Sequence, residues 1–122
     1  MLFRFYMHVN LELVRQYRYL GAEYDKRVAY FYNAPWREQN LRSLEYAESY
    51  FRTALYYWEE ALGWSSKAWS LSYVELERGH YWSDTNYRVE HFELDYDDII
   101  QTDLGRINRV REDFLAMDED TY

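Results

Sequence analysis

Residues 14–31, VRQYRYLGAEYDKRVAYF, repeat two kinds of side chain at intervals of seven. The small row is Val14, Gly21 and Val28, and the aromatic row is Tyr17, Tyr24 and Phe31. Both rows fall on one face of a helix, as positions a and d of a heptad do. The pattern predicts a helix from Asn10, a residue suited to the N-cap, to Asn33.

A second helix is predicted from Pro35 to Leu62, because proline suits a first turn and Gly63 suits the position after a C-terminus. Its rows mirror those of the first helix. Large residues recur at Leu44, Phe51 and Trp58, and small ones at Ala47, Ala54 and Ala61. Folding the chain back near residue 34 gives a close antiparallel hairpin with small residues opposite small ones. The expected pairs are Gly21 with Ala47, Val14 with Ala54, Tyr17 with Phe51, and Tyr24 with Leu44.

The remaining residues predict two further helices. A short one runs from Lys67 to Arg78 after a Ser65 or Ser66 cap, and Gly79 closes it. Apolar residues then recur at steps of three and four from Val89 to Phe114, a long helix whose start lies at Val89 or only near Asp95. Residues 92–96 also alternate like a short strand, so 85–95 stay open between helix, strand and loop. The acidic end, Met117–Tyr122, is expected to fray.

Composition supports one all-α domain of four to five helices over residues 1–122, or a piece of a larger helical-repeat protein. The chain is 48% hydrophobic and 21% aromatic, which excludes intrinsic disorder. Four glycines and one proline argue against a turn-dense β fold. The net charge of -8 argues against direct binding of nucleic acid or anionic membranes. No signal peptide or transmembrane segment is recognisable, and the compartment stays unknown.

Two short motifs resemble the tetratricopeptide repeat. Tyr17-x-x-Leu20-Gly21-x-x-Tyr24 is similar to its first-helix signature, and Ala47-x-x-x-Phe51-x-x-Ala54 to its second, within residues 14–62. They lie about fourteen residues farther apart than the repeat allows, and Glu59 replaces its proline. The resemblance implies a partner-binding scaffold without catalysis.

In such repeats the concave groove comes from the first helix. The resemblance places Arg15, Arg18, Ala22, Asp25 and Lys26 there, and implies that Arg15, Arg18 and Lys26 would hold an acidic peptide or a C-terminal carboxylate. Ala22 departs from the amide expected at its position. The alternative is that these cations form a solvated face pairing with Glu12, Glu23 and Asp25.

Candidate metal ligands lack the spacing that a metal site needs. Glu77-x-x-His80 has the spacing of di-iron bundles but occurs once, and three histidines (His8, His80, His91) show no zinc-binding spacing. Four aspartates lack the order of a calcium loop: Asp95, Asp97, Asp98 and Asp103. The absence of cysteine removes thiol chemistry and cysteine-ligated metals. We therefore predict no metal, no cofactor and no catalysis.

Fifteen tyrosines exceed what a four-helix core can bury. Tyrosine is enriched where proteins meet partners, because it offers a rigid contact area with a polar tip. The sequence thus predicts a non-catalytic interaction or assembly domain using Tyr46, Tyr50 and Tyr57, whose partner is a protein, a peptide or another copy. One alternative is an acidic mimic of nucleic acid using carboxylates between Asp84 and Asp103. Another is a metal-dependent bundle enzyme joining Glu77, His80 and His91.

Overall fold

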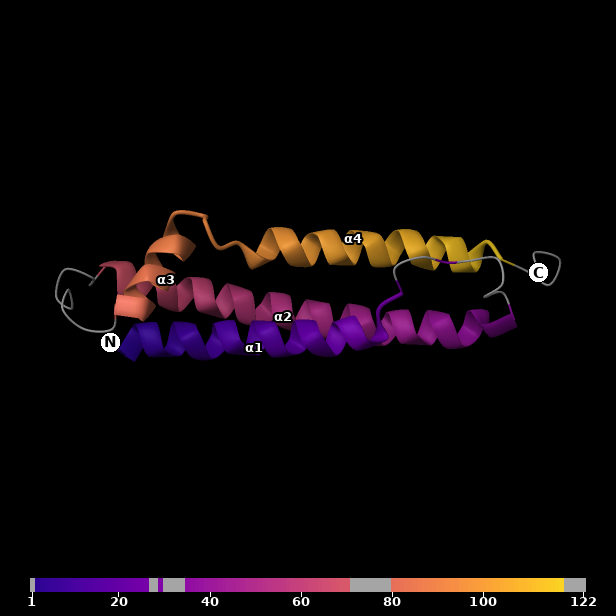
Figure 1. The fold of residues 1–122 in the computed structure, drawn as a ribbon, viewed down its shortest axis with the longest axis horizontal. Helices are drawn as coiled ribbons and strands as arrows, with labels where there is room; N and C mark the ends of the chain where they lie inside the picture. The colour runs from indigo at the N-terminus through magenta and orange to yellow at the C-terminus, as the bar shows by residue number, and fades with distance from the viewer. Residues whose placement is uncertain (1, 27–28, 30–34, 71–79, 118–122) are drawn as a thin grey trace.

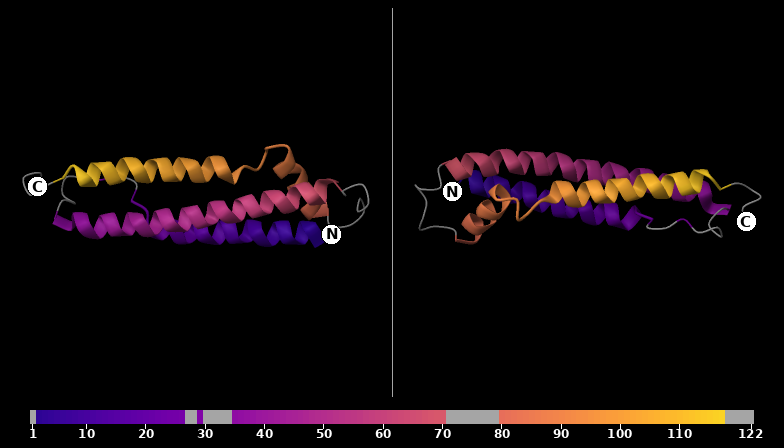
Figure 2. Two further views of the ribbon diagram at one scale, coloured as in Figure 1. Left: turned by 180° about the vertical axis from the view of Figure 1, so that it is seen from behind. Right: turned by 90° about the horizontal axis from the view of Figure 1, so that it is seen from above.

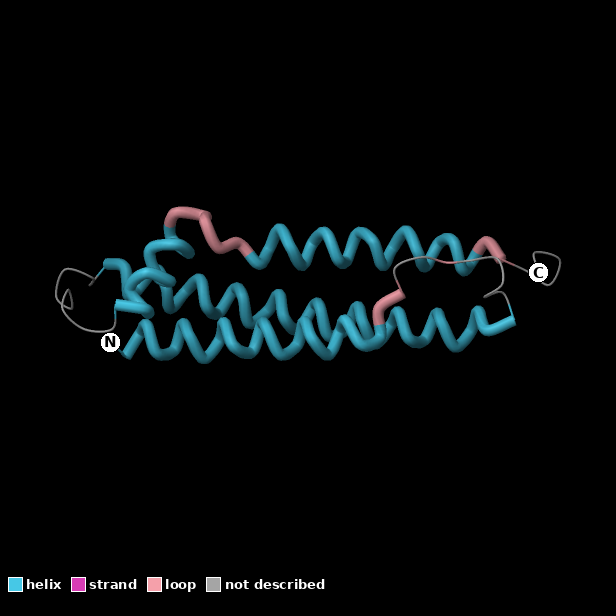
Figure 3. Tube along the Cα trace, viewed as in Figure 1, coloured by secondary structure: helices cyan, strands magenta, loops and turns pink. Residues whose placement is uncertain are grey.

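The computed structural model describes residues 2–26, 29, 35–70 and 80–117, with the side chains of 80–83 also left out of the description. Within these residues the chain forms four helices and no strand (Figures 1 and 3). They are α1 (Leu2–Tyr24), α2 (Arg37–Ser70), α3 (His80–Glu90) and α4 (Tyr96–Leu115). The predicted all-α class is confirmed.

The helices form an elongated bundle. α1 and α2 lie side by side and antiparallel, and this pair has the most extensive contact in the described part of the chain. α4 runs along α2 in the opposite direction, and the short α3 lies at the end of the bundle near the N-terminus (Figure 2). α2 extends beyond the end of α1, where α4 is its neighbour (Figure 1). No described helix has the length and apolarity needed to cross a membrane.

The hairpin core follows the seven-residue rows that the sequence shows. Its buried members are Met7, Leu11 and Val14 from α1, and Leu44, Ala47, Phe51, Ala54, Trp58 and Ala61 from α2. The register differs from the expected one at Gly21, which lies against the ring of Phe51. A Cβ atom built on Gly21 would be 3.1 Å from Cζ of Phe51, so the glycine makes room for this ring. The predicted pairing of small with small is wrong there, because the smallest residue faces a large one.

The ends of the first two helices differ from those predicted. α1 begins at Leu2, and Asn10 lies inside it, where its side-chain amide donates to the carbonyl oxygen of Tyr6 at 2.8 Å. The helix ends at Tyr24, and the predicted end at Asn33 lies outside the described residues. α2 begins at Arg37 and continues through Gly63 to Ser70.

Packing explains why α2 passes Gly63. Glycine inside a helix costs only about 1 kcal/mol relative to alanine, and the residues after it are held by tertiary contacts. Ser65 and Ala68 are buried, and the ring of Trp64 lies 5.8 Å from that of Phe3. Lys67 therefore belongs to α2, and the helix predicted to begin there is wrong; its remainder, 71–78, lies outside the described residues.

The later of the two predicted starts of the last helix is confirmed. Asp95 is the N-cap of α4, and its carboxylate accepts a hydrogen bond from the backbone N–H of Asp98 at 3.3 Å. Residues 91–94 form a turn, so the strand interpretation of 92–96 is wrong. Phe92 in this turn has φ of 60°, and its side chain is 84% exposed. α4 buries one apolar row against the hairpin: Ile100, Leu104, Ile107, Val110 and Phe114.

Candidate functional site

Five tyrosines of α1 and α2 form a chain of ring contacts along the seam of the hairpin. We call this set, Tyr17, Tyr24, Tyr46, Tyr50 and Tyr57, the tyrosine ladder. The ring centroids are 5.3 Å apart for Tyr24 and Tyr46, and 5.8 Å apart for Tyr24 and Tyr50. Tyr17 continues it, with centroids 6.3 Å from Tyr50 and 5.5 Å from Tyr57. The three tyrosines chosen from the sequence are therefore brought together by two tyrosines of α1.

The members of the ladder differ in exposure. Tyr46 is 58% exposed, whereas Tyr50 and Tyr57 are half-buried and Tyr57 packs against the core. Stacked and tilted rings at these distances stabilise one another beyond the area that they bury, by about 0.5 to 1.5 kcal/mol a pair. The ladder thus presents exposed aromatic area on rings that are already held in place.

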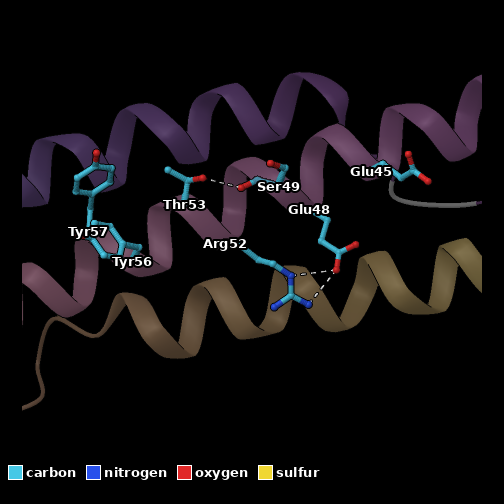
Figure 4. A pocket seen from close by; sticks show the side chains of 7 residues that line it. All are labelled: Glu45, Glu48, Ser49, Arg52, Thr53, Tyr56 and Tyr57. Carbon is cyan, nitrogen blue, oxygen red and sulfur yellow. Dashed lines mark hydrogen bonds and ion pairs between the residues drawn. The ribbon is translucent and has the colours of Figure 1, made fainter.

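A shallow pocket of about 610 Å³ borders the ladder on α2 (Figure 4). Its lining comprises Glu45, Glu48, Ser49, Arg52, Thr53, Tyr56 and Tyr57. Tyr56 is 56% exposed and meets Tyr57 edge to face at 5.1 Å between centroids. This arrangement offers two aromatic rings and several hydrogen-bonding groups to a side chain of a partner.

Glu48 at the pocket pairs with arginines of two helices. Arg52 Nη2 lies 2.9 Å from Glu48 Oε1, and Arg111 of α4 donates to Glu48 Oε2. Burial alone would raise the pKa of Glu48, but the hydrogen bonds from Arg52 and Arg111 more than offset this and hold the pKa below 4.5. Glu48 is therefore ionised at neutral pH and ties the pocket to α4.

Two of the three cations assigned to a first-helix groove, Arg15 and Arg18, contact residues of α4. Arg15 Nε donates to the hydroxyl of Tyr96 at 3.3 Å, and Arg15 Nη1 lies 3.1 Å from Glu12 Oε2. The guanidinium carbon of Arg18 lies 5.5 Å from the ring centroid of Tyr96, and Arg18 Nη2 lies 4.0 Å from Asp103 Oδ2. Of the expected solvated pairs, that of Arg15 with Glu12 is present.

Asp25 is also joined to α4, because Arg106 donates to its Oδ2 while Arg106 Nη1 lies 3.0 Å from Asp103 Oδ1. Lys26 is half-buried, and Ala22 is exposed. The structure thus brings Arg15, Arg18 and Asp25 to the interface of α1 with α4. Binding by Arg15, Arg18 and Lys26 stays a prediction.

Sequence reasoning missed a buried polar cluster where α1, α2 and α3 meet. Asn86 Nδ2 donates to the carbonyl oxygen of Ser65 at 3.0 Å and to Ser65 Oγ at 2.8 Å. Arg4 Nε donates to Asn86 Oδ1 at 3.4 Å, and both residues are buried. These contacts hold α3 against the hairpin. No sequence signal marked them, because polar residues near 86 are typical of a loop.

The candidate metal ligands are not brought together in the part of the chain that is described. His91 Nδ1 lies 2.8 Å from the carbonyl oxygen of Tyr87, and its ring stacks on that tyrosine. Glu77 and the side chain of His80 lie outside the description. Among the described residues, no three His, Cys, Asp or Glu side chains are placed to hold a metal ion. Three of the four aspartates have partners: Asp95 caps α4, Asp97 accepts a hydrogen bond from Gln101, and Asp103 contacts arginines.

Fold and surface together define a class: a four-helix bundle with a tyrosine-rich hairpin on one side. The sequence matches the family model named Domain of unknown function (DUF8513) over residues 2–117, and the chain belongs to this family. No curated protein and no solved structure matched the sequence.

Proposed function

We propose that this domain is a non-catalytic protein–protein interaction or assembly module that binds its partner through the tyrosine ladder. The observation that carries the proposal is the contact of Tyr46 and Tyr50 with Tyr24, which holds exposed aromatic rings at one seam. Aromatic residues of this kind are enriched among those that contribute most to binding. The three half-buried members, Tyr17, Tyr50 and Tyr57, anchor the exposed ones.

The pocket beside the ladder supports the same proposal. Its rings, Tyr56 and Tyr57, would receive an apolar side chain of the partner, while Ser49 and Thr53 offer hydroxyls at the same surface. Arg52 and Glu48 neutralise each other at the rim. Such a mixture of rings and neutralised polar groups is typical of the centre of a protein interface.

The resemblance to tetratricopeptide repeats is part of this proposal. The two signature segments pack on each other, with Gly21 of the first against Phe51 of the second, which supports a helical-hairpin scaffold. Under this proposal Lys26, with Arg15 and Arg18, would steer an acidic segment of the partner. Because Arg15 and Arg18 contact α4, we place the main contact on the ladder.

The test is affinity capture from cells that make the protein, comparing the wild-type chain with Tyr46→Ala/Tyr50→Ala. The matched control is Tyr19→Ala, since Tyr19 is 64% exposed on α1 but lies outside the ladder. We expect a protein, either a second copy or another chain, to be retained by wild type and the control and lost from the double variant. Unchanged far-ultraviolet helicity shows that the variants fold. Equal retention by all three chains would contradict a binding role for the ladder.

A further inference from the structure

α1 is apolar on two faces. One face is buried in the core of the bundle through Met7, Leu11 and Val14. The outer face carries a second row, in which steps of four and three residues alternate: Leu2, Tyr6, Val9, Leu13, Gln16 and Leu20. Of these, Leu2 is 59% exposed and Val9 42%. A continuous apolar row on a helix usually packs against another surface, so the outer row indicates a partner.

α2 carries a matching row beside it. Steps of four and three alternate again through Tyr46, Tyr50, Thr53, Tyr57, Glu60 and Trp64. The two rows adjoin, because the ring of Tyr6 lies 4.8 Å from that of Trp64. We call the twelve positions the open hairpin face; α4 packs on the other side of the hairpin (Figure 2).

The open hairpin face carries very little charge. One of its twelve positions is charged, Glu60, in a chain that is 30% charged with a net charge of -8. The cores of protein interfaces are depleted in charge and enriched in aromatic residues in the same way. Two copies that repel each other elsewhere can therefore approach at this face.

The exposed area is close to what a stable dimer needs. At about 200 Å² for each large side chain, the exposed parts of its apolar residues, with Phe5 and Tyr56 at its edges, amount to roughly 700 Å². A standard interface buries about 800 Å² on each partner. The open hairpin face is also long, since the 23 residues of α1 span roughly 34 Å.

We propose that the open hairpin face pairs with the same face of a second copy of this chain. Two hairpins with the same heptad spacing interdigitate as knobs into holes, and a two-fold axis lets each copy offer both rows to the other. This inference rests on the proposed function, and it identifies the partner of the domain as a second copy of the chain. The tyrosine ladder would then lie inside a four-helix interface made by α1 and α2 of both copies.

The experiment is size-exclusion chromatography with light scattering on the full chain, over a hundredfold range of protein concentration. We expect a mass twice the 15.2 kDa of the chain. In Val9→Glu/Leu20→Glu, two exposed apolar residues of the face become carboxylates, and we expect dimerisation to weaken by about a hundredfold or more. The matched control is Ile99→Glu/Leu115→Glu on α4, where Ile99 is 39% and Leu115 58% exposed. This control adds the same charge outside the face and should remain a dimer.

A wild-type monomer at every concentration would overturn the inference, as would a dimer that Val9→Glu/Leu20→Glu leaves intact or that only the α4 control disrupts. Circular dichroism establishes that each variant is helical. The affinity capture distinguishes a failure of the second-copy inference from a failure of the proposed function. A monomeric chain that retains another protein through Tyr46 and Tyr50 would refute the second copy and leave the interaction role standing.

Discussion

Replacing Gly63 by Ala should stabilise the protein, because Gly63 lies inside α2 and the added Cβ would meet no atom within 4 Å beyond the adjoining residues and backbone of its own helix. The change removes the conformational freedom of glycine from the unfolded chain and introduces no clash. We expect the free energy of unfolding to rise by about 0.5 to 1 kcal/mol, as for glycine-to-alanine changes at exposed helix positions.

Gly21→Ala gains the same helix propensity, worth about 1 kcal/mol, but the added methyl group contacts another side chain. The added Cβ would lie 3.1 Å from Cε1 and Cζ of Phe51, a ring that is 2% exposed and therefore has little room to move. Overpacking of a core costs about 1 to 3 kcal/mol. The net expectation is a loss of about 1 kcal/mol, opposite in sign to Gly63→Ala.

Urea unfolding followed by circular dichroism measures both variants against wild type at one protein concentration. For a chain of this length 1 kcal/mol corresponds to roughly 3 to 5 °C in Tm, so thermal unfolding gives an independent check. A loss of stability in Gly63→Ala would refute the continuity of α2 through this residue. A gain in Gly21→Ala equal to that in Gly63→Ala would refute the close contact with Phe51.

Three further predictions concern single residues. Burial, and then the charge of Arg15, lower the pKa of His8 below 6.5. The imidazole of the unfolded chain therefore binds a proton more tightly than that of the folded chain. The free energy of unfolding should fall as pH decreases from 6.5 through the lowered pKa. Urea titrations between about pH 8 and about pH 5 should show this loss in wild type and not in His8→Gln. Phe92→Gly should raise the unfolding free energy by about 1 kcal/mol in the same assay, because φ of 60° is costly for phenylalanine and free for glycine. Asn86→Ala should lower it by about 2 to 3 kcal/mol, since Ser65 would lose its buried partner, and an unchanged urea midpoint would contradict that.

The hairpin could be predicted because its signals are local and strong. Val14 and Gly21 lie seven residues apart, as Ala47 and Ala54 do, which is typical of a closely packed helix pair, and the structure buries all four. Asp95 likewise indicated the start of α4, because a cap acts on the turn that follows it. The end of α2 could not be predicted, since a signal worth about 1 kcal/mol at Gly63 is outweighed by later packing.

The candidate site was predicted less completely, because its geometry depends on contacts between distant parts of the chain. Tyr46, Tyr50 and Tyr57 stood out as tyrosines that the core could not bury. The register predicted from the sequence paired Tyr17 with Phe51 and Tyr24 with Leu44, so it did not anticipate the contacts of these three residues with Tyr17 and Tyr24. Arg15 and Arg18 looked solvated on their own helix. Their partners, Tyr96 and Asp103, lie about eighty residues away on α4.

The outer row of α1 shows why a second surface is hard to recognise from sequence. Tyr6, Leu13 and Leu20 recur at seven residues, as Met7, Val14 and Gly21 do, so periodicity alone gives two candidate inner faces. Residue size distinguishes the two faces. Gly21 and Val14 allow α2 to approach α1 closely, whereas a row of tyrosine and leucine would prevent that approach. Once the small row faces inward, the large row must face outward. The large row is then left exposed, and the Val9 and Leu20 variants test the proposal that a second copy covers it.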